Sequence, residues 1–279
     1  MNFSAAFLNY KPIFTVDEQH FLHGLSKEYS FKKFISDHRS FEERSIHYAF
    51  VSSKIEGNQY SKKGASLLLK YGFTENGKNM RDAMMLVNLR DSFLNVILSA
   101  NHNVNTVLTK QYVCSIHSEV SDKLLNIRDR GQVRQKRVTI AGSDYIPLDS
   151  SFLLAAELIR LLTTASAIKE PFEQAVYVHC NIAYLQYFSD CNKRVARLME
   201  TAVMAANSIT PIFLQEGAIQ SYLISILNYY ETGDYTMYKN LFLSEYEHTI
   251  KQLLGKAPEQ IEAQRRALEE IKKINKLVQ

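Results

Sequence analysis

A short polar turn between two apolar helical segments constrains this chain more than any other feature of its sequence. After the turn, apolar residues recur at i, i+3, i+4, i+7, i+8 and i+11, namely Val195, Leu198, Met199, Ala202, Val203 and Ala206. This spacing is typical of a helix with one buried face. Before the turn, Pro171 suits the first turn of a helix, and one apolar face continues through Phe172, Val176, Cys180 and Ala183. The sequence therefore predicts two helices joined by a polar turn at residues 189–193.

The rest of the chain also favours helices. Of 279 residues, 46% are hydrophobic, which is enough for a large core, and only ten are glycine and five proline. Two capping boxes, Thr15-x-x-Glu18 and Ser40-x-x-Glu43, mark helix starts. Apolar periodicity predicts helices over 15–29, 40–56, 61–71, 79–100, 109–125, 150–163, 218–231 and 235–246, and an amphipathic tail over 259–277.

Composition also limits the class of protein. The net charge of +4 is small and spread along the chain, so it does not indicate nucleic-acid or membrane binding. Three cysteines without metal-type spacing fit a reducing compartment. There is no signal-peptide pattern and no apolar run near the ~20 residues of a membrane span. We therefore expect a soluble, cytoplasmic protein, and the sequence leaves homo-oligomer formation open.

The polar turn brings together the features of an anion site. Free N–H groups and the positive end of a helix dipole meet there with Arg194 and Arg197. A phosphate is the anion that this arrangement suits best. Asp190, one turn before Arg194, is placed to carry a hydrated divalent cation beside it.

Residues 138–147 break the helical pattern. Val138 and Ile140 alternate with Thr139 and Ala141, which is the period of a strand. Residues 141–144 supply a turn, and residues 145–147 return. We predict a short β-hairpin at the surface, made basic by Arg134, Lys136 and Arg137.

The stretch from Gln186 to Arg197 resembles the signature of the Fic (Fido-fold) family, H-P-F-x-[DE]-G-N-G-R-x-x-R. Phe188, Asp190, Asn192, Arg194 and Arg197 match it, whereas Gln186, Tyr187, Cys191 and Lys193 do not. A second stretch, Ser52 to Gly57, resembles the inhibitory motif of the family, [ST]-x-x-x-E-[GN]. The order of inhibitory motif, hairpin and signature is also that of Fic proteins whose inhibitory helix precedes the core.

This resemblance implies an all-α, Fic-like core over residues 45–245 with a small β-hairpin flap at about 132–147. Residues 1–44 would form an N-terminal helical extension and residues 246–279 a C-terminal helical tail. The implied activity is transfer of AMP from ATP, with Mg²⁺, to a protein hydroxyl, and the target would align along the flap.

The resemblance also assigns roles to single residues. Asn192, Lys193, Arg194 and Arg197 would hold the nucleotide, and Asp190 the Mg²⁺. Glu56, with Ser52 in the same motif, would pair with Arg197 and keep it from the γ-phosphate.

The departures from the signature affect the positions that carry its chemistry. The family's histidine base is replaced by Gln186, and a carboxamide has no useful basicity at neutral pH. His179 cannot replace it, since seven helical residues separate the two by about 10 Å. Cys191 and Lys193 add Cβ atoms where glycines would let a phosphate approach.

Two hypotheses therefore remain. The chain is a Fic-type transferase with impaired AMP transfer and altered chemistry, or it is a catalytically inactive Fic-fold module that acts by binding nucleotide or protein. The retained Glu56 motif favours the first, and Gln186, Cys191 and Lys193 favour the second.

Overall fold

The computed structural model describes residues 1–100 and 103–255, and this part of the chain consists of helices joined by loops, without a β-strand. Its α-helices are α1 (Val16–Glu28), α2 (Phe31–Ser36), α3 (His38–Ile55), α4 (Lys62–Tyr71), α5 (Met80–Leu98), α6 (Val104–Val107), α7 (Lys110–Val120), α8 (Ser151–Ala167), α9 (Pro171–Leu185), α10 (Asn192–Ala206), α11 (Ile219–Thr232) and α12 (Thr236–Leu253). Two 3₁₀ helices, η1 (Ala5–Leu8) and η2 (Glu216–Ala218), complete the set.

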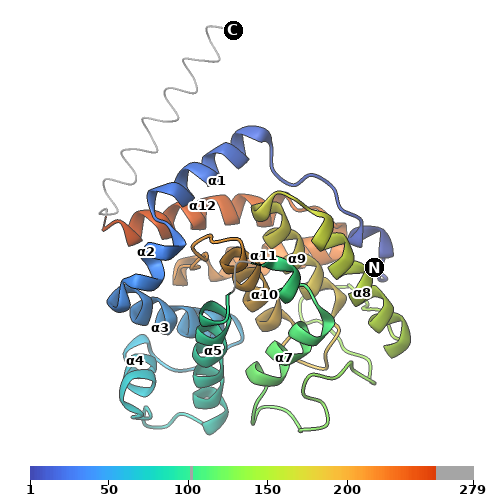
Figure 1. Cartoon of the computed structure of the whole chain (residues 1–279). Helices are drawn as coiled ribbons and strands as arrows, with labels where there is room; N and C mark the ends of the chain where they lie inside the picture. Colours follow the sequence, from blue (N-terminus) through green and yellow to red (C-terminus); the bar gives the residue numbers. More distant parts are fainter. Residues whose placement is uncertain (101–102, 256–279) are drawn as a thin grey trace, which may run out of the picture.

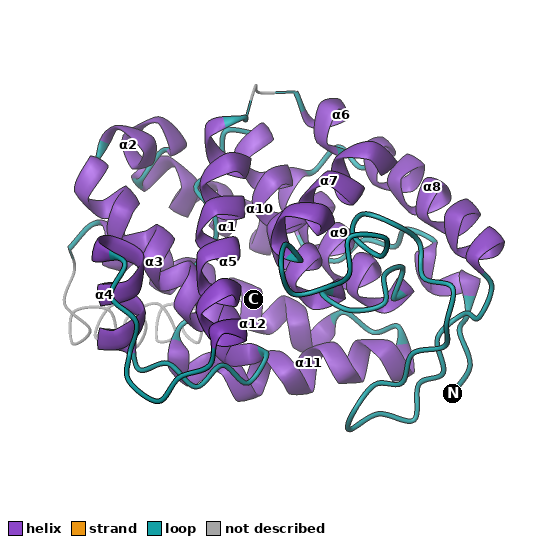
Figure 2. Cartoon of the chain, turned by 90° about the horizontal axis from the view of Figure 1, so that it is seen from below, coloured by secondary structure: helices purple, strands orange, loops and turns teal. Residues whose placement is uncertain are grey.

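Helices α9 and α10 form the centre of the molecule. Every residue of α9 from Phe172 to Leu185 is buried, and Lys193 is the one residue of α10 that is not. Neighbouring helices cover this pair, with α8 and α11 against α9, and α5, α6 and α7 against α10 (Figure 1; Figure 2). A helix that is buried on all sides needs such a shell, because its apolar side chains have no face to turn to water.

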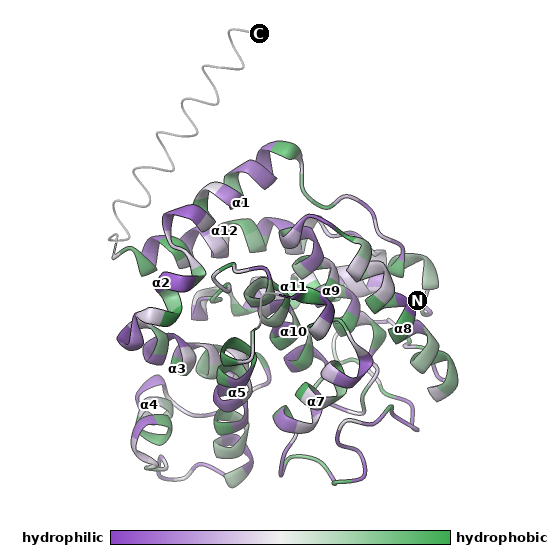
Figure 3. Cartoon of the chain, viewed as in Figure 1, coloured by the Kyte–Doolittle hydropathy of each residue, from purple (hydrophilic) through white to green (hydrophobic). Residues whose placement is uncertain are grey.

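The hydropathy of the helices follows this arrangement. The surrounding helices α1, α3 and α5 show bands of both hydrophilic and hydrophobic residues (Figure 3), as amphipathic helices do. Buried side chains from α1 to α12 belong to one hydrophobic cluster. No described helix combines the length and apolar character that a membrane crossing requires.

The predicted N-terminal extension is part of this core. The buried carboxylate of Glu173 in α9 accepts hydrogen bonds from the backbone N–H groups of Ile13 (3.2 Å) and Phe14 (3.1 Å), and from Gln19 Nε2 (3.1 Å). The predicted boundaries after residues 44 and 245 fall inside α3 and α12. The predicted tail helix, residues 259–277, lies outside the described residues.

The helix-start signals in the sequence are confirmed at Thr15, whose capping box is complete, and at Pro171, which is in the first turn of α9. The predicted capping box at Ser40 is wrong. Helix α3 starts two residues earlier because Asp37 caps it: its carboxylate accepts the Ser40 N–H (3.1 Å) and the Ser40 hydroxyl (2.8 Å).

The predicted β-hairpin flap is also wrong as secondary structure. Gly142 adopts the expected turn conformation, with φ +78°, but residues 138–140 and 145–147 form no ladder. Ile146 pairs instead with the start of the chain, accepting the Phe3 N–H at 3.0 Å in an isolated parallel bridge. Tyr145 is buried and stacks on Tyr184 of α9. An isolated two-stranded ribbon has marginal stability in water. Here residues 145–147 make their contacts with the start of the chain and with α9 instead.

Candidate functional site

The inhibitory-motif segment (residues 52–57, hereafter the arm) ends α3 directly beside α10. Glu56 is the C-cap of α3, and Gly57, with φ +85°, lets the chain turn away. Glu56 Oε1 lies 2.8 Å from Arg197 Nη2, and Glu56 Oε2 lies 3.4 Å from Lys193 Nζ. The predicted contact between Glu56 and Arg197 is therefore present, whereas the inhibitory role of Glu56 stays a prediction.

Arg197 is held by every nitrogen of its guanidinium. Nε donates to Ser52 Oγ (2.8 Å), Nη2 donates to the Ser52 carbonyl (3.1 Å) as well as to Glu56, and Nη1 donates to the Tyr222 hydroxyl (3.0 Å). Burial alone would raise the pKa of Glu56, but the charges of Arg197, Lys193 and Arg194 outweigh it and lower that pKa. The carboxylate of Glu56 thus remains ionised and is itself the anion that these cations hold.

The turn between α9 and α10 (residues 186–191, hereafter the signature turn) has two residues in the left-handed region, Gln186 (φ 49°) and Cys191 (φ 64°). A non-glycine residue pays roughly 1–2 kcal/mol for this conformation, so the packing around the turn enforces it. Cys191 therefore keeps a glycine-like backbone at the N-cap of α10. Burial raises the pKa of its thiol to about 12, which makes it unreactive at neutral pH.

Gln186 points into the signature turn, where its carboxamide is fully bonded. Its Nε2 donates to the Ala183 carbonyl (2.7 Å) and the Tyr230 hydroxyl (3.4 Å), and its Oε1 accepts from Asn192 Nδ2 (3.1 Å). Asn192 also accepts the Phe188 N–H (2.9 Å) and donates to the Phe188 carbonyl (2.9 Å). Asn192 therefore holds the turn together in this structure, and its predicted contact with nucleotide stays a prediction.

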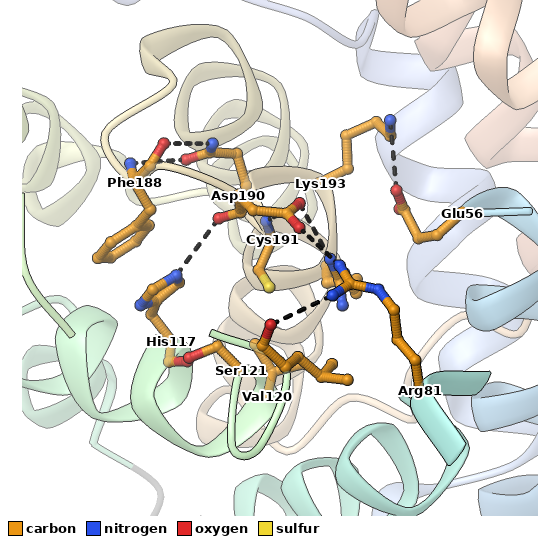
Figure 4. Close-up of polar contacts among 12 residues, drawn as sticks. Glu56, Arg81, His117, Val120, Ser121, Phe188, Asp190, Cys191 and Lys193 are labelled. Carbon is orange, nitrogen blue, oxygen red and sulfur yellow. Dashed lines mark hydrogen bonds and ion pairs between the residues drawn. The ribbon is translucent and has the colours of Figure 1, made fainter. Parts of the chain in front are cut away.

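The carboxylate of Asp190 is held by two guanidinium groups, and Figure 4 shows Arg81 of α5 pointing toward it. Arg194 Nη2 donates to Asp190 Oδ1 (3.0 Å), and Arg81 Nη2 from α5 lies 3.5 Å from Asp190 Oδ2. Arg194 is only 2% exposed, yet its Nε and Nη1 have no hydrogen-bond partner among residues 1–100 and 103–255. A buried guanidinium with two free donors is suited to a further anion.

His117 joins α7 to the signature turn. Its ring stacks on Phe188 with centroids 3.7 Å apart and an angle of 1° (Figure 4). Its Nδ1 accepts the Gly131 N–H (2.8 Å), so Nε2 carries the proton and donates to the Asp190 carbonyl (3.3 Å). No local pattern in the sequence links His117 to the turn, because 73 positions separate it from Asp190.

This bonding predicts a pH dependence of stability. Burial lowers the pKa of His117 to about 4, and that of His47 likewise, both below the unfolded value. The unfolded chain therefore binds more protons between pH 6.5 and 4, so the free energy of unfolding should fall over that window as pH falls, by up to about 3 kcal/mol per histidine. Urea unfolding of the wild type and of His117→Asn at several pH values checks this: the variant should lose the part of the slope that comes from His117, and an unchanged slope would exclude His117 as a source.

A cleft of about 470 Å³ opens beside the signature turn. Its lining combines the arm, the turn, the 138–141 segment and one face of α11: Glu56, Val138, Thr139, Ile140, Ala141, Gln186, Ser189, Asp190, Cys191, Asn192, Lys193, Gln220, Leu223, Ile224, Ile226, Leu227 and Tyr230. The structure thus brings Glu56, Gln186, Asp190, Asn192 and Lys193 to one cavity. Arg194 and Arg197 do not line this cavity, but their charges help to lower the pKa of Glu56.

Three residues that sequence reasoning missed belong to this region: Arg81, Tyr222 and Tyr230. Their partners Asp190, Arg197 and Gln186 are between 25 and 109 positions away along the chain, and no local pattern marks such contacts. His179, by contrast, is a core residue and does not line the cleft. It is fully buried and bonds Glu200 (3.1 Å) and the Tyr222 hydroxyl (3.2 Å).

Comparison with known proteins identifies the family of the domain that contains the signature turn. Residues 107–204 match the family model described as Fic/DOC family, so the chain contains a Fic/DOC domain. Over 214 residues it is 22% identical to protein adenylyltransferase fic-1 of Caenorhabditis elegans. The aligned region covers 75% of this chain and 41% of the relative. The chain therefore spans about two fifths of the length of that curated relative.

Solved structures show the same fold. A structure of C. elegans Fic-1 aligns with a TM-score of 0.69 at 17% identity, covering 86% of this chain and 72% of that one. A Fic domain containing signaling protein from Bacteroides thetaiotaomicron aligns with a TM-score of 0.67 at 15% identity, covering 85% and 99%. At these identities the likeness concerns the fold.

Proposed function

We propose that this Fic/DOC domain protein binds the phosphates of ATP in the cleft beside the signature turn, and that Glu56 blocks the site in the state described here. The observation that carries the proposal is the position of the Glu56 carboxylate. It contacts Arg197 and Lys193 at the N-terminal end of α10, and Arg194 is near enough to lower its pKa. A set of cations that holds a carboxylate at a helix N-terminus is chemically suited to a phosphate.

We further propose that AMP transfer from this site is weak. A general base contributes about 10²–10⁴-fold to such a reaction, and Gln186 offers none. No histidine lines the described cleft. The Tyr230 hydroxyl, which does line it, is too weak an acid to ionise, because burial raises its pKa well above the usual value. The chemistry that remains is binding and orientation of the nucleotide.

Mg²⁺ enters this proposal only together with the nucleotide. Among the described residues no group of three or more metal-binding side chains occurs. Asp190 is one carboxylate, which is enough for Mg²⁺ bound mainly through phosphates and water. However, Arg194 and Arg81 occupy its two oxygens. Asp190 would hold Mg²⁺ after a polyphosphate has drawn these guanidinium groups away.

A catalytically inactive module remains the second candidate, because Gln186 is so fully bonded within the turn. In either case a protein partner would pass along the 138–141 segment, which forms one wall of the cleft. This segment forms no ladder within the described chain, so its backbone is able to pair with an extended peptide.

Calorimetric titration of ATP with Mg²⁺ into the wild type and Glu56→Gly tests the proposal. The substitution removes the carboxylate and frees Arg197 and Lys193, so we expect the variant to bind at least tenfold more tightly. Glu43→Gly is a matched control, since Glu43 lies in the same helix and pairs with the exposed Arg39. Absence of binding to a folded Glu56→Gly variant would reject nucleotide binding and favour the protein-binding module.

A further inference from the structure

Glu56 is held by two cations from successive turns of α10. Arg197 lies at one carboxylate oxygen (2.8 Å) and Lys193 at the other (3.4 Å), so each oxygen has its own cation. Figure 4 shows the Lys193 side chain extended toward Glu56. Lys193 and Arg197 are four residues apart and therefore project from the same face of the helix. The carboxylate bridges them.

The two cations differ in exposure and in their other contacts. The side chain of Arg197 is 4% exposed and is fixed by Ser52 and Tyr222, whereas that of Lys193 is 31% exposed and lines the cleft. In the part of the chain that the structure describes, Glu56 is the ion-pair partner of Lys193. Lys193 is thus the cation that an anion in the cleft reaches first.

Electrostatics explains why this pair forms. Lys193, Arg194 and Arg197 place three positive charges within the first two turns of α10, at the end where the helix dipole is already positive. Like charges four residues apart also repel each other. An anion between Lys193 and Arg197 removes both penalties, and Glu56 supplies it when the arm is closed.

We propose that Lys193 is a positioning residue that anchors Glu56 from the cleft side and makes the closed arm responsive to anions in the cleft. The response to nucleotide rests on the proposed function, but the anchoring does not. A phosphate oxygen that takes the place of Glu56 at Lys193 leaves the carboxylate with Arg197 alone. Opening of the arm then requires the loss of one further ion pair.

Hydrogen exchange without ligand tests the anchoring. The N–H groups of Glu56, Gly57 and Asn58 bond to carbonyls of Ser53 and Lys54 and report opening of the arm. In Lys193→Gln these amides should exchange about two- to fivefold faster, the range for a half-exposed ion pair. Added salt should accelerate them in the wild type and much less in the variant, since the Arg197 pair is buried. Lys193→Arg, which keeps the charge, should resemble the wild type. Wild-type exchange and salt response in Lys193→Gln would overturn the proposal.

ATP titration of the same substitution with and without Glu56→Gly tests the response to nucleotide. If Lys193 only contacts phosphate, Lys193→Gln weakens binding by the same factor in both backgrounds. If it also anchors Glu56, the weakening should be about two- to fivefold smaller where Glu56 is present, which is the factor expected for opening of the arm. Equal factors would overturn the regulatory role. Absence of ATP binding to Glu56→Gly would instead reject the proposed function, and the exchange measurement would still judge the anchor.

Discussion

Replacing Gln186 by histidine in the Glu56→Gly variant should raise AMP transfer by about 10²–10⁴-fold, the usual contribution of a positioned general base. An imidazole titrates near neutrality and can take the proton that a carboxamide cannot. The surroundings suit the change, because the Ala183 carbonyl and the Tyr230 hydroxyl, which now bond the Gln186 amide, lie within reach of a ring nitrogen. Incorporation of labelled AMP from ATP into the chain itself and into proteins of a cell extract would measure the effect.

Gln186→Asn is the matched control, since it changes the side chain without adding a basic group. It should leave transfer at the level of Glu56→Gly alone. ATP binding by each variant, measured in parallel, separates loss of the pocket from loss of chemistry. Transfer by Glu56→Gly as fast as that of the histidine variant would show that another group serves as base and that Gln186 is not the defect.

Removing Arg197 should have the largest effect on stability. Arg197→Leu should lower the free energy of unfolding by about 3–5 kcal/mol, because it leaves the largely buried Glu56 carboxylate without its principal partner. The Ser52 carbonyl and the Tyr222 hydroxyl also lose their donor. Urea unfolding at neutral pH measures this loss.

A double-mutant cycle with Glu56→Leu isolates the pair. The double variant should be more stable than the sum of the single effects by at least 2 kcal/mol, since no buried charge is left unpaired. Arg194→Leu is the comparison, because its partner Asp190 is 42% exposed and its loss should cost less. Additive effects of Arg197→Leu and Glu56→Leu would show that the contact contributes little.

The same cycle should depend on pH. Because the pKa of Glu56 is lowered in the folded state, its contribution is complete above the unfolded carboxyl pKa and is lost as pH falls through the folded one. The coupling between Glu56 and Arg197 should therefore shrink in acid below the usual carboxyl range. The pKa of His117 is also lowered, but for a different reason: burial disfavours the charged imidazolium, whereas neighbouring cations favour the charged carboxylate of Glu56.

The failure of the predicted hairpin shows what a local pattern omits. The alternation at 138–141 and the turn at Gly142 are real features of the sequence, and the turn forms. A strand also requires a neighbouring strand, however, and here the Ile146 carbonyl accepts the Phe3 N–H at the start of the chain instead. Burial of Tyr145 against Tyr184 favours that arrangement over a free ribbon.

The sequence by itself predicted the longer helices, the turn between α9 and α10, and the contact of Glu56 with Arg197, but not the short helices α2 and α6. The first two depend on apolar spacing and capping, which act over a few residues, and the third follows from two motifs in a known order. Only the tertiary structure decided that Lys193 shares Glu56, that Gln186 is bonded to Tyr230 and that His117 holds the turn. These contacts join residues 44 to 137 positions apart, and such pairs are selected by packing of whole helices, which no local pattern encodes.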